Sequence, residues 1–342
     1  MVVPAVLLVA AFPLQVAVSL PFIGALLATA AALGVMVKAA EIAVGRLIAV
    51  ARAFNVPDAV VASTVVAVGT SLPEIGAHVV ASAGILSGTL DYHIASATVM
   101  GGNMGSSTVQ QTLLVGVFVL GVGRTLLSSS FMRSTYYPMV LALVATLALS
   151  VDGTISRLDG VVLLVGFGAY VVSGVRTAPT DGQSYDGASI NRLRDTAIAV
   201  GALVLVFASA YVVLVVVQLV VETLGLNGSM VGVVTLGLAA ALPELSTVVE
   251  AIRRRSPDIA LGTLVGSNVV NPLVGFGLGG AISTYAVPPS VILWDFPFKL
   301  VVAVGFLLVV RRNGGAVTRR EGAWLVGAYF VFVSVRFIFY AT

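Results

Sequence analysis

The sequence predicts an all-α polytopic membrane protein, in which ten transmembrane helices form two inverted five-helix repeats. Of its 342 residues, 58% are hydrophobic and 10% are charged, whereas about 25% of the residues of a soluble domain are charged. So much apolar surface requires a lipid bilayer around it and excludes a nucleic-acid-binding protein. A polar linker in the middle of the chain and a motif that occurs once in each half predict the two repeats.

Residues 1–18 are apolar, but they contain two prolines and no Lys or Arg. They therefore predict an N-terminal apolar extension and not a cleaved signal peptide. Residues 19–176 form the first predicted repeat, residues 177–195 a hydrophilic linker, and residues 196–342 the second repeat. Each predicted span has a length near the roughly 20 residues that a bilayer requires. The spans are 19–50, 57–84, 94–121, 135–151, 159–176, 196–221, 228–251, 258–284, 291–310 and 322–340.

The arginines of the loops predict the orientation. The loops after the odd-numbered spans hold 13 arginines, and those after the even-numbered spans hold only Arg157. The positive-inside rule places the arginine-rich loops, including the linker 177–195, in the cytoplasm and both termini outside. Because each half has an odd number of spans, the second half must run opposite to the first, as in transporters built from inverted repeats.

The two halves share two motifs. The stretch VAVGTSLPEI (66–75) corresponds to LGLAAALPEL (236–245), and GGNMGSSTVQ (101–110) to GTLVGSNVVN (262–271). Leu-Pro-Glu thus occurs at 72–74 and at 242–244, and each later motif contains Gly-xxx-Gly followed by a serine. Glycines at this spacing let membrane helices approach closely.

The repeated Pro-Glu pair predicts a cation site between two discontinuous helices, broken at Pro73 and Pro243. Proline lacks an N–H and leaves a backbone carbonyl without its helical partner, which at membrane depth is tolerated only inside protein or along a cavity. A carboxylate there costs about 2.5 kcal/mol or more and indicates a function. Inverted breaks would bring Glu74 and Glu244 together, and all-oxygen surroundings suit Ca²⁺, Na⁺ or Mg²⁺. The other candidate side chains are Thr70, Ser71, Ser106, Ser267, Gln110 and Asn271.

Other polar residues of the spans are expected to be structural. His78 follows Glu74 by four residues and shares its helix face; a structural hydrogen bond is expected, and a proton relay or gating is the alternative. Two charged pairs have helical spacing, and each is expected to be a structural pair. These pairs are Lys38 with Glu41 and Asp295 with Lys299.

GTSLPE, the later G-S-x-x-x-N/Q element and their repetition resemble the cation/Ca²⁺ antiporter superfamily, with the prokaryotic sodium/calcium exchangers as the closest branch. The resemblance covers nearly the whole chain beyond about residue 20. It implies ten helices, alternating access and one central cluster for which Ca²⁺ and the coupling ions compete. The implied Ca²⁺ ligands are the carboxylates of Glu74 and Glu244 and the backbone oxygens of Thr70 and Ala240. The implied sodium ligands are Ala67, Ser71, Ser106, Ser267 and Gly237.

Several positions depart from that family pattern. The G-T-S of the first half becomes Ala239, Ala240 and Ala241 in the second, which removes two hydroxyls. Asn271 stands where sodium exchangers commonly carry Asp, and Gln110 where the family has Asn. The remaining two carboxylates can neutralise one divalent cation. The spacing is 32 residues from Glu74 to Ser106 but 23 from Glu244 to Ser267, which predicts an insertion in the polar stretch 87–96.

The predicted function is therefore antiport of Ca²⁺, or a similar divalent cation, against Na⁺ in a prokaryotic cell membrane. Proton coupling is the alternative, because burial and a neighbouring negative charge favour the protonated form of a carboxylic acid. A cation channel is more remote. The chain has neither H-E-x-x-H nor G-x-S-x-G, so no enzyme is predicted. No cofactor and no obligate protein partner are expected beyond the ions and the bilayer.

Overall fold

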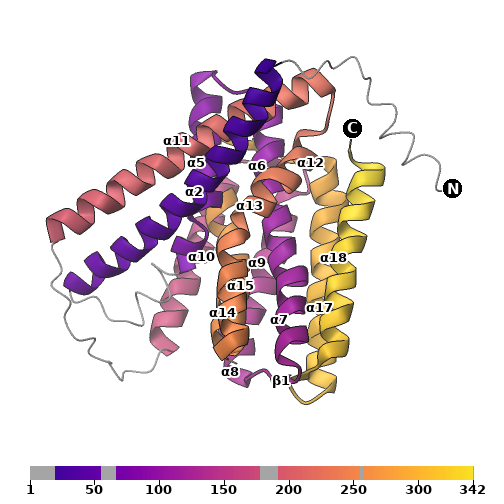
Figure 1. Ribbon diagram of the computed structural model, residues 1–342. Helices are drawn as coiled ribbons and strands as arrows, with labels where there is room; N and C mark the ends of the chain where they lie inside the picture. Colours follow the sequence, from indigo (N-terminus) through magenta and orange to yellow (C-terminus); the bar gives the residue numbers. More distant parts are fainter. Residues whose placement is uncertain (1–19, 55–66, 178–191, 255–256, 342) are drawn as a thin grey trace.

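The computed structural model describes residues 20–54, 67–177, 192–254 and 257–341, which are mostly helical (Figure 1). Within these ranges eight helices are long and apolar enough to cross a bilayer, and the bent pair Gly228–Ala240 and Leu242–Arg253 would make a ninth. A helix satisfies its own backbone hydrogen bonds, which a chain in lipid requires. The predicted span 57–84 begins outside the described residues, as does the extension 1–18, so the count of ten stays a prediction.

Within the described residues, the first half contains one long helix, a pair of helices separated at Ser71 and three further candidate spans. Its elements are α2 (Leu20–Ala53), α4 (Ala67–Thr70), α5 (Leu72–Ser87), α6 (Tyr92–Thr108), the π-helical turn η2 (Val109–Leu114), α7 (Val115–Val122), β1 (Thr125–Leu126), α8 (Ser129–Phe131), the π-helical turn η3 (Met132–Tyr136), α9 (Tyr137–Ser150), β2 (Thr154–Ile155) and α10 (Arg157–Thr177).

The second half repeats this order and starts at Arg192, inside the predicted linker. Its elements are α11 (Arg192–Leu224), α12 (Gly228–Gly232), the π-helical turn η4 (Val233–Gly237), α13 (Leu238–Ala240), α14 (Leu242–Arg254), α15 (Pro257–Val270), the π-helical turn η5 (Asn271–Phe276), α16 (Gly277–Ser283), β3 (Tyr285–Ala286), the π-helical turn η6 (Val291–Asp295), α17 (Phe296–Arg312), β4 (Ala316–Val317) and α18 (Arg319–Phe339).

Two short antiparallel sheets connect the halves. β1 pairs with β4 and β2 pairs with β3. β1 and β3 each follow the third span of their half, and β2 and β4 each precede the last helix. Each sheet therefore pairs a strand that follows the third span of one half with a strand that precedes the last helix of the other half. This pairing is expected when the halves run in opposite directions. Arg124 and Arg319 flank β1 and β4, whereas Arg157 follows β2, so the arginine-rich loops after spans 3 and 9 lie together.

The predicted insertion at 87–96 lengthens two helices and does not form a long loop. α5 continues to Ser87 and ends at Gly88, whose positive φ of 70° closes the helix. Asp91 caps α6 by accepting a hydrogen bond from the backbone N–H of Ile94. Three residues after Gly88 thus suffice to reverse the chain, and α5 and α6 form a long hairpin at one end of the bundle (Figure 1).

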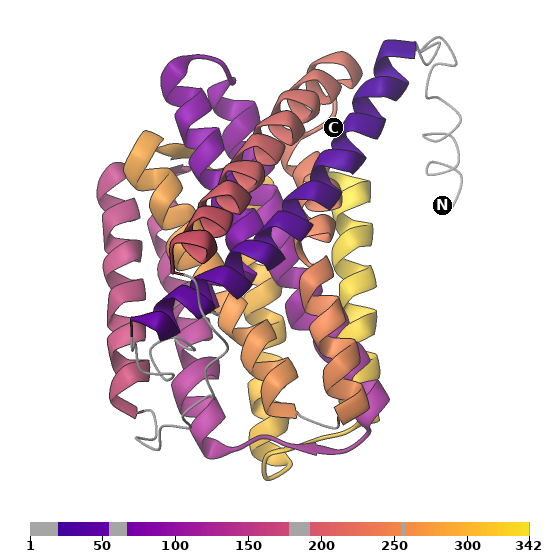
Figure 2. The ribbon, with the colours of Figure 1, turned by 60° about the vertical axis from the view of Figure 1, so that its left-hand side comes forward.

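α2 and α11, the first helices of the two halves, lie side by side and tilted across one side of the bundle (Figures 1 and 2). An ion pair of 2.8 Å between Arg46 and Asp195 joins them. Lys38 and Glu41 form the expected pair at 2.7 Å, exposed on α2.

Glycines set the contact between the halves at the centre of the bundle. A Cβ atom on Gly101 of α6 would lie 2.1 Å from the carbonyl oxygen of Ser229, and one on Gly105 would lie 2.9 Å from the Cα atom of Val233. No real side chain tolerates these distances. Glycine therefore lets α6 pack directly on the backbone of α12 and η4 and carries the residues that follow Gly105 into the interior.

Candidate cation-binding site

Each half interrupts a helix just before its Leu-Pro-Glu motif. Ser71 separates α4 from α5, and Ala241 separates α13 from α14, where the two segments meet at 43°. In each new helix the proline is the second residue, where its missing N–H breaks no helical hydrogen bond. The glutamate is the third residue, in the first turn, where the helix dipole favours a negative charge. Both carboxylates thus lie at helix N-termini inside the bundle.

Glu74 and Glu244 are buried, with 5% and 0% of their surface exposed, and a chain of three hydrogen bonds connects their carboxylates. The Ser106 hydroxyl donates to Glu74 Oε1 at 2.7 Å. The Gln110 amide nitrogen donates to Ser106 Oγ at 3.1 Å and to Glu244 Oε1 at 3.2 Å. Ser106 thus reaches Glu74 despite the longer spacing of the first half. Gln110 directs its nitrogen to the carboxylate, and its oxygen accepts from Asn268 at 3.0 Å.

The second half supplies the corresponding pair. Ser267 Oγ donates to Glu244 Oε1 at 3.5 Å and lies 3.1 Å from the hydroxyl of Thr70. The Asn271 amide nitrogen lies 3.5 Å from Glu74 Oε1 and 3.2 Å from Ser107 Oγ. Both carboxylates therefore contact side chains from both halves. η2 begins next to Gln110 and η5 begins at Asn271; π-helical turns of this kind are frequent at functional sites.

Several buried oxygens of this cluster lack a hydrogen-bond partner in the described part of the chain. They are Glu74 Oε2, Glu244 Oε2, Ser71 Oγ, Asn103 Oδ1 and Asn271 Oδ1. A buried polar atom without a partner costs about 1–3 kcal/mol, and more when it is charged. These atoms are the oxygen ligands that a hard cation prefers. The described residues contain no group of three or more His, Cys, Asp or Glu, so two carboxylates are the acids of this site.

Asn103 also belongs to this cluster, and it is not one of the site residues that the sequence predicts. Its amide nitrogen contacts His78 Nε2 at 3.1 Å and donates to the backbone oxygen of Asn271 at 2.9 Å, which leaves Oδ1 free. Asn103 and Ala240 line one small cavity with Glu74. The available signal was its spacing: Asn103 precedes Ser106 by three residues, which places both on one helix face.

His78 makes the hydrogen-bond contacts expected of it, and its role stays a prediction. The ring is fully buried, and its Nδ1 lies 3.3 Å from the hydroxyl of Tyr285. Tyr285 donates in turn to the backbone oxygen of His78 at 2.9 Å. His78 thus holds Asn103 through the nitrogen of its amide group.

The remaining candidates are backbone ligands. Gly237 ends η4 and packs against Gly102, Gly105 and Ser106 of α6. Ala67 is the first residue of α4, and its side chain lies outside the described part.

The family model described as "Sodium/calcium exchanger protein" matches residues 24–174 and 196–338. The chain belongs to this family. It is 29% identical over 296 residues to the inner membrane protein YrbG of Escherichia coli (strain K12), an alignment that covers 83% of this chain and 88% of YrbG. The relationship makes the protein a membrane transporter of the cation/Ca²⁺ antiporter family.

Solved exchanger structures share the fold. The sodium-calcium exchanger NCX_Mj superposes with a TM-score of 0.61 at 20% identity and covers 91% of this chain and 98% of its own. The H⁺/Ca²⁺ exchanger CAX superposes with a TM-score of 0.71 at 11% identity and covers 92% of this chain and 86% of its own. The membrane fold of this family is thus present over nearly the whole chain.

Proposed function

We propose that this protein is a secondary antiporter that exchanges Ca²⁺, or a similar divalent cation, for Na⁺ by alternating access at one site between Glu74 and Glu244. The observation that carries the proposal is the pair of buried carboxylates, each engaged through Oε1 and each with an unpaired Oε2. Two negative charges match one divalent cation, and their burial keeps the cation out of water.

The ligands that the family resemblance implies fit this arrangement. Ala240, an implied backbone ligand of Ca²⁺, lines the cavity beside Glu74. Ser71, Ser106 and Ser267 lie in the cluster with oxygen atoms that Na⁺ can use. Asn103 and Asn271 each add an unpaired amide oxygen. The proposed site therefore holds either one Ca²⁺ or the coupling ions, but not both.

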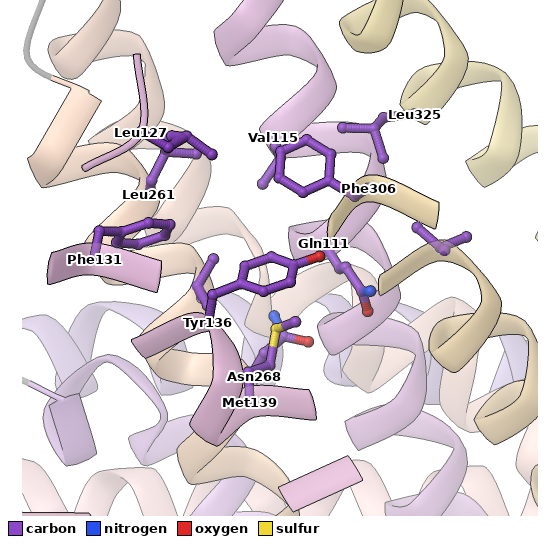
Figure 3. Close-up of a pocket in the computed structure, with 12 residues that line it drawn as sticks. Gln111, Val115, Leu127, Phe131, Tyr136, Met139, Leu261, Asn268, Phe306 and Leu325 are labelled. Atoms are coloured by element: carbon purple, nitrogen blue, oxygen red, sulfur yellow. The ribbon is translucent and has the colours of Figure 1, made fainter. Parts of the chain in front are cut away.

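A second cavity offers an access path from the end of the bundle that holds β1 and β4. It lies between Leu127 and Phe131, just beyond β1, and Asn268, which contacts Gln110 (Figure 3). Apart from Gln111, Tyr136 and Asn268 its lining is apolar. In the proposed ten-helix inverted repeat, with both termini outside, this end is cytoplasmic. An apolar path can close by dewetting when the site faces the other side.

Proton coupling is the second candidate, favoured by the composition of the site. Asn271 replaces a third acid, and Ala241 replaces the hydroxyl that Ser71 supplies in the first half. Fewer oxygens and fewer charges remain for several sodium ions, whereas a carboxylate pair can also exchange Ca²⁺ for protons.

Transport of ⁴⁵Ca²⁺ into proteoliposomes tests the proposal under Na⁺ and pH gradients applied separately. Uptake that follows the Na⁺ gradient supports sodium coupling, and uptake driven by the pH gradient alone selects proton coupling. Uptake without any opposing gradient would indicate a channel. Glu74→Gln and Glu244→Gln should each abolish exchange, because a neutral amide cannot compensate the charge of a buried divalent ion. Full activity of either variant would refute the site.

A further inference from the structure

Three further charged side chains are buried in the bundle, and the carboxylate pair does not account for them. Asp295 and Arg336 are fully buried, and Lys299 is 3% exposed. Sequence spacing predicted a pair of Asp295 with Lys299. The structure instead pairs Asp295 with Arg336 at 3.1 Å, and Arg336 also donates to Ser229 at 2.6 Å. Asp295 and Lys299 thus make no direct ion pair among the described residues, although their charges interact. The Lys299 ammonium contacts Asn268 instead.

Lys299 stands at the end of a hydrogen-bonded relay that leads to the cation site. Its ammonium donates to Asn268 Oδ1 at 2.9 Å. The Asn268 nitrogen donates to Gln110 Oε1 at 3.0 Å, and the Gln110 nitrogen donates to Glu244 Oε1 at 3.2 Å. Three hydrogen bonds thus connect a buried positive charge to one of the two carboxylates.

The chemistry of lysine fixes the direction of this relay. An ammonium group only donates, so Asn268 must turn its oxygen to Lys299 and its nitrogen to Gln110. Gln110 must then accept with its oxygen and present its nitrogen to Glu244. The site consequently receives a donor at a position where a free amide oxygen would be a cation ligand.

The described residues of the other half contain no such relay. Tyr137 and Pro138 correspond to Phe296 and Pro297 at the same place after the π-helical turn, so Val140 corresponds to Lys299. In the later motif, Ser107 corresponds to Asn268 and Asn271 to Gln110. Asn271 keeps its oxygen unpaired within the described residues. The fold therefore does not need a lysine at this point. The relay reaches Glu244 in three hydrogen bonds and Glu74 in four, because Gln110 also donates to Ser106.

We propose that Lys299 is a built-in cation for the Glu244 side of the site. Lys299 is connected to Glu244 through the hydrogen bonds of Asn268 and Gln110. Its positive charge replaces one coupling cation that would otherwise bind next to Glu244. Each divalent ion then exchanges for fewer monovalent ions than two carboxylates alone would require. The inference rests on the proposed antiport, and Lys299 acts in it as a positioning residue that touches no transported ion.

Lys299→Gln and Lys299→Met remove the charge, and Lys299→Gln keeps a donor for Asn268. The matched control is Lys38→Met, which removes the other lysine of the chain from the exposed surface of α2. Two readouts are needed: equilibrium binding of ⁴⁵Ca²⁺ to the purified protein, and the gradient of the coupling ion at which net ⁴⁵Ca²⁺ flux stops in proteoliposomes with the membrane potential clamped at zero. The second gives the number of coupling ions per Ca²⁺.

Both Lys299 variants should bind Ca²⁺ about tenfold more tightly, because a neighbouring positive charge no longer repels it. Their flux should stop at the ion gradient that corresponds to one more coupling ion per Ca²⁺, while Lys38→Met matches the wild type. If Lys299→Met does not fold, Lys299→Gln alone decides. Wild-type Ca²⁺ affinity and a wild-type zero-flux gradient in a folded Lys299 variant would overturn the inference. Absence of Ca²⁺ binding by the wild type would overturn the proposed function instead.

Discussion

Asn271→Asp restores the acid that sodium exchangers commonly carry at this position, and its effect can be worked out from the structure. The Asn271 amide nitrogen lies 3.5 Å from Glu74 Oε1. A carboxylate oxygen in its place would face another negative charge at that distance. With an effective dielectric constant of about 20, the repulsion is about 5 kcal/mol. The variant must offset this energy by binding a proton or another cation.

We therefore expect Asn271→Asp to bind Na⁺ more tightly than the wild type. The electrostatic energy alone corresponds to a factor on the order of a thousand. Side-chain movement and the hydroxyl of Ser107, 3.2 Å from the amide nitrogen, reduce it. The expected gain in apparent Na⁺ affinity is then at least about tenfold.

The assay is ⁴⁵Ca²⁺ exchange in proteoliposomes, measured as a function of Na⁺ concentration at two fixed pH values. Asn313→Asp, which adds the same charge at an exposed position after α17, is the control and should behave as the wild type. If Asn271→Asp keeps the Na⁺ and pH dependence of the wild type, Asn271 is not part of the ion site. A gain that appears only at the lower pH would mean that the new acid binds protons and not sodium.

Two further predictions concern residues that support the site. Asn103→Leu removes an unpaired amide oxygen from the cluster and should weaken ⁴⁵Ca²⁺ binding about tenfold, as expected for one interaction with a charged group; unchanged affinity would exclude Asn103 as a ligand. Gly101→Ala places a methyl group 2.1 Å from the backbone of Ser229 and should destabilise the protein by about 3 kcal/mol, seen as a lower thermal unfolding temperature in detergent. Gly34→Ala, on α2 with open space around it, is the matched control, and equal unfolding temperatures of the two variants would contradict the packing argument.

The carboxylate pair could be predicted from the sequence because its signal is local. A proline followed by an acid in an apolar span is costly in lipid, and its recurrence in a second half of opposite direction brings the two acids together. Ser106 and Gln110 could also be predicted from the repeated motif. Their contacts with Glu74 and Glu244 could not, because the two Glu-to-Ser spacings differ and only the lengths of α5 and α6 resolve the register.

The contacts of Asp295 and Lys299 could not be predicted because the local rule fails there. Residues four apart share a face in an α-helix, but Asp295 ends the π-helical turn η6, where the spacing per turn is wider. Its partner Arg336 lies on α18 and contacts the Asp295 carboxylate through one nitrogen atom at 3.1 Å. Lys299 is then left to contact Asn268. Pairings between distant helices of this kind leave no periodic signal in one sequence.

Two differences between the halves have the same effect on cation binding next to Glu244. On the Glu244 side of the proposed site, the break carries Ala240 and Ala241 where the first half has the hydroxyls of Thr70 and Ser71. The relay from Lys299 reaches the same side, through Gln110. Loss of oxygen ligands and gain of a fixed positive charge both weaken binding of a monovalent cation next to Glu244. The Glu74 side keeps Ser71 and the free oxygens of Asn103 and Asn271. A coupling ion should therefore bind on the Glu74 side, and removing Ser71 should impair coupling more than removing Ser267.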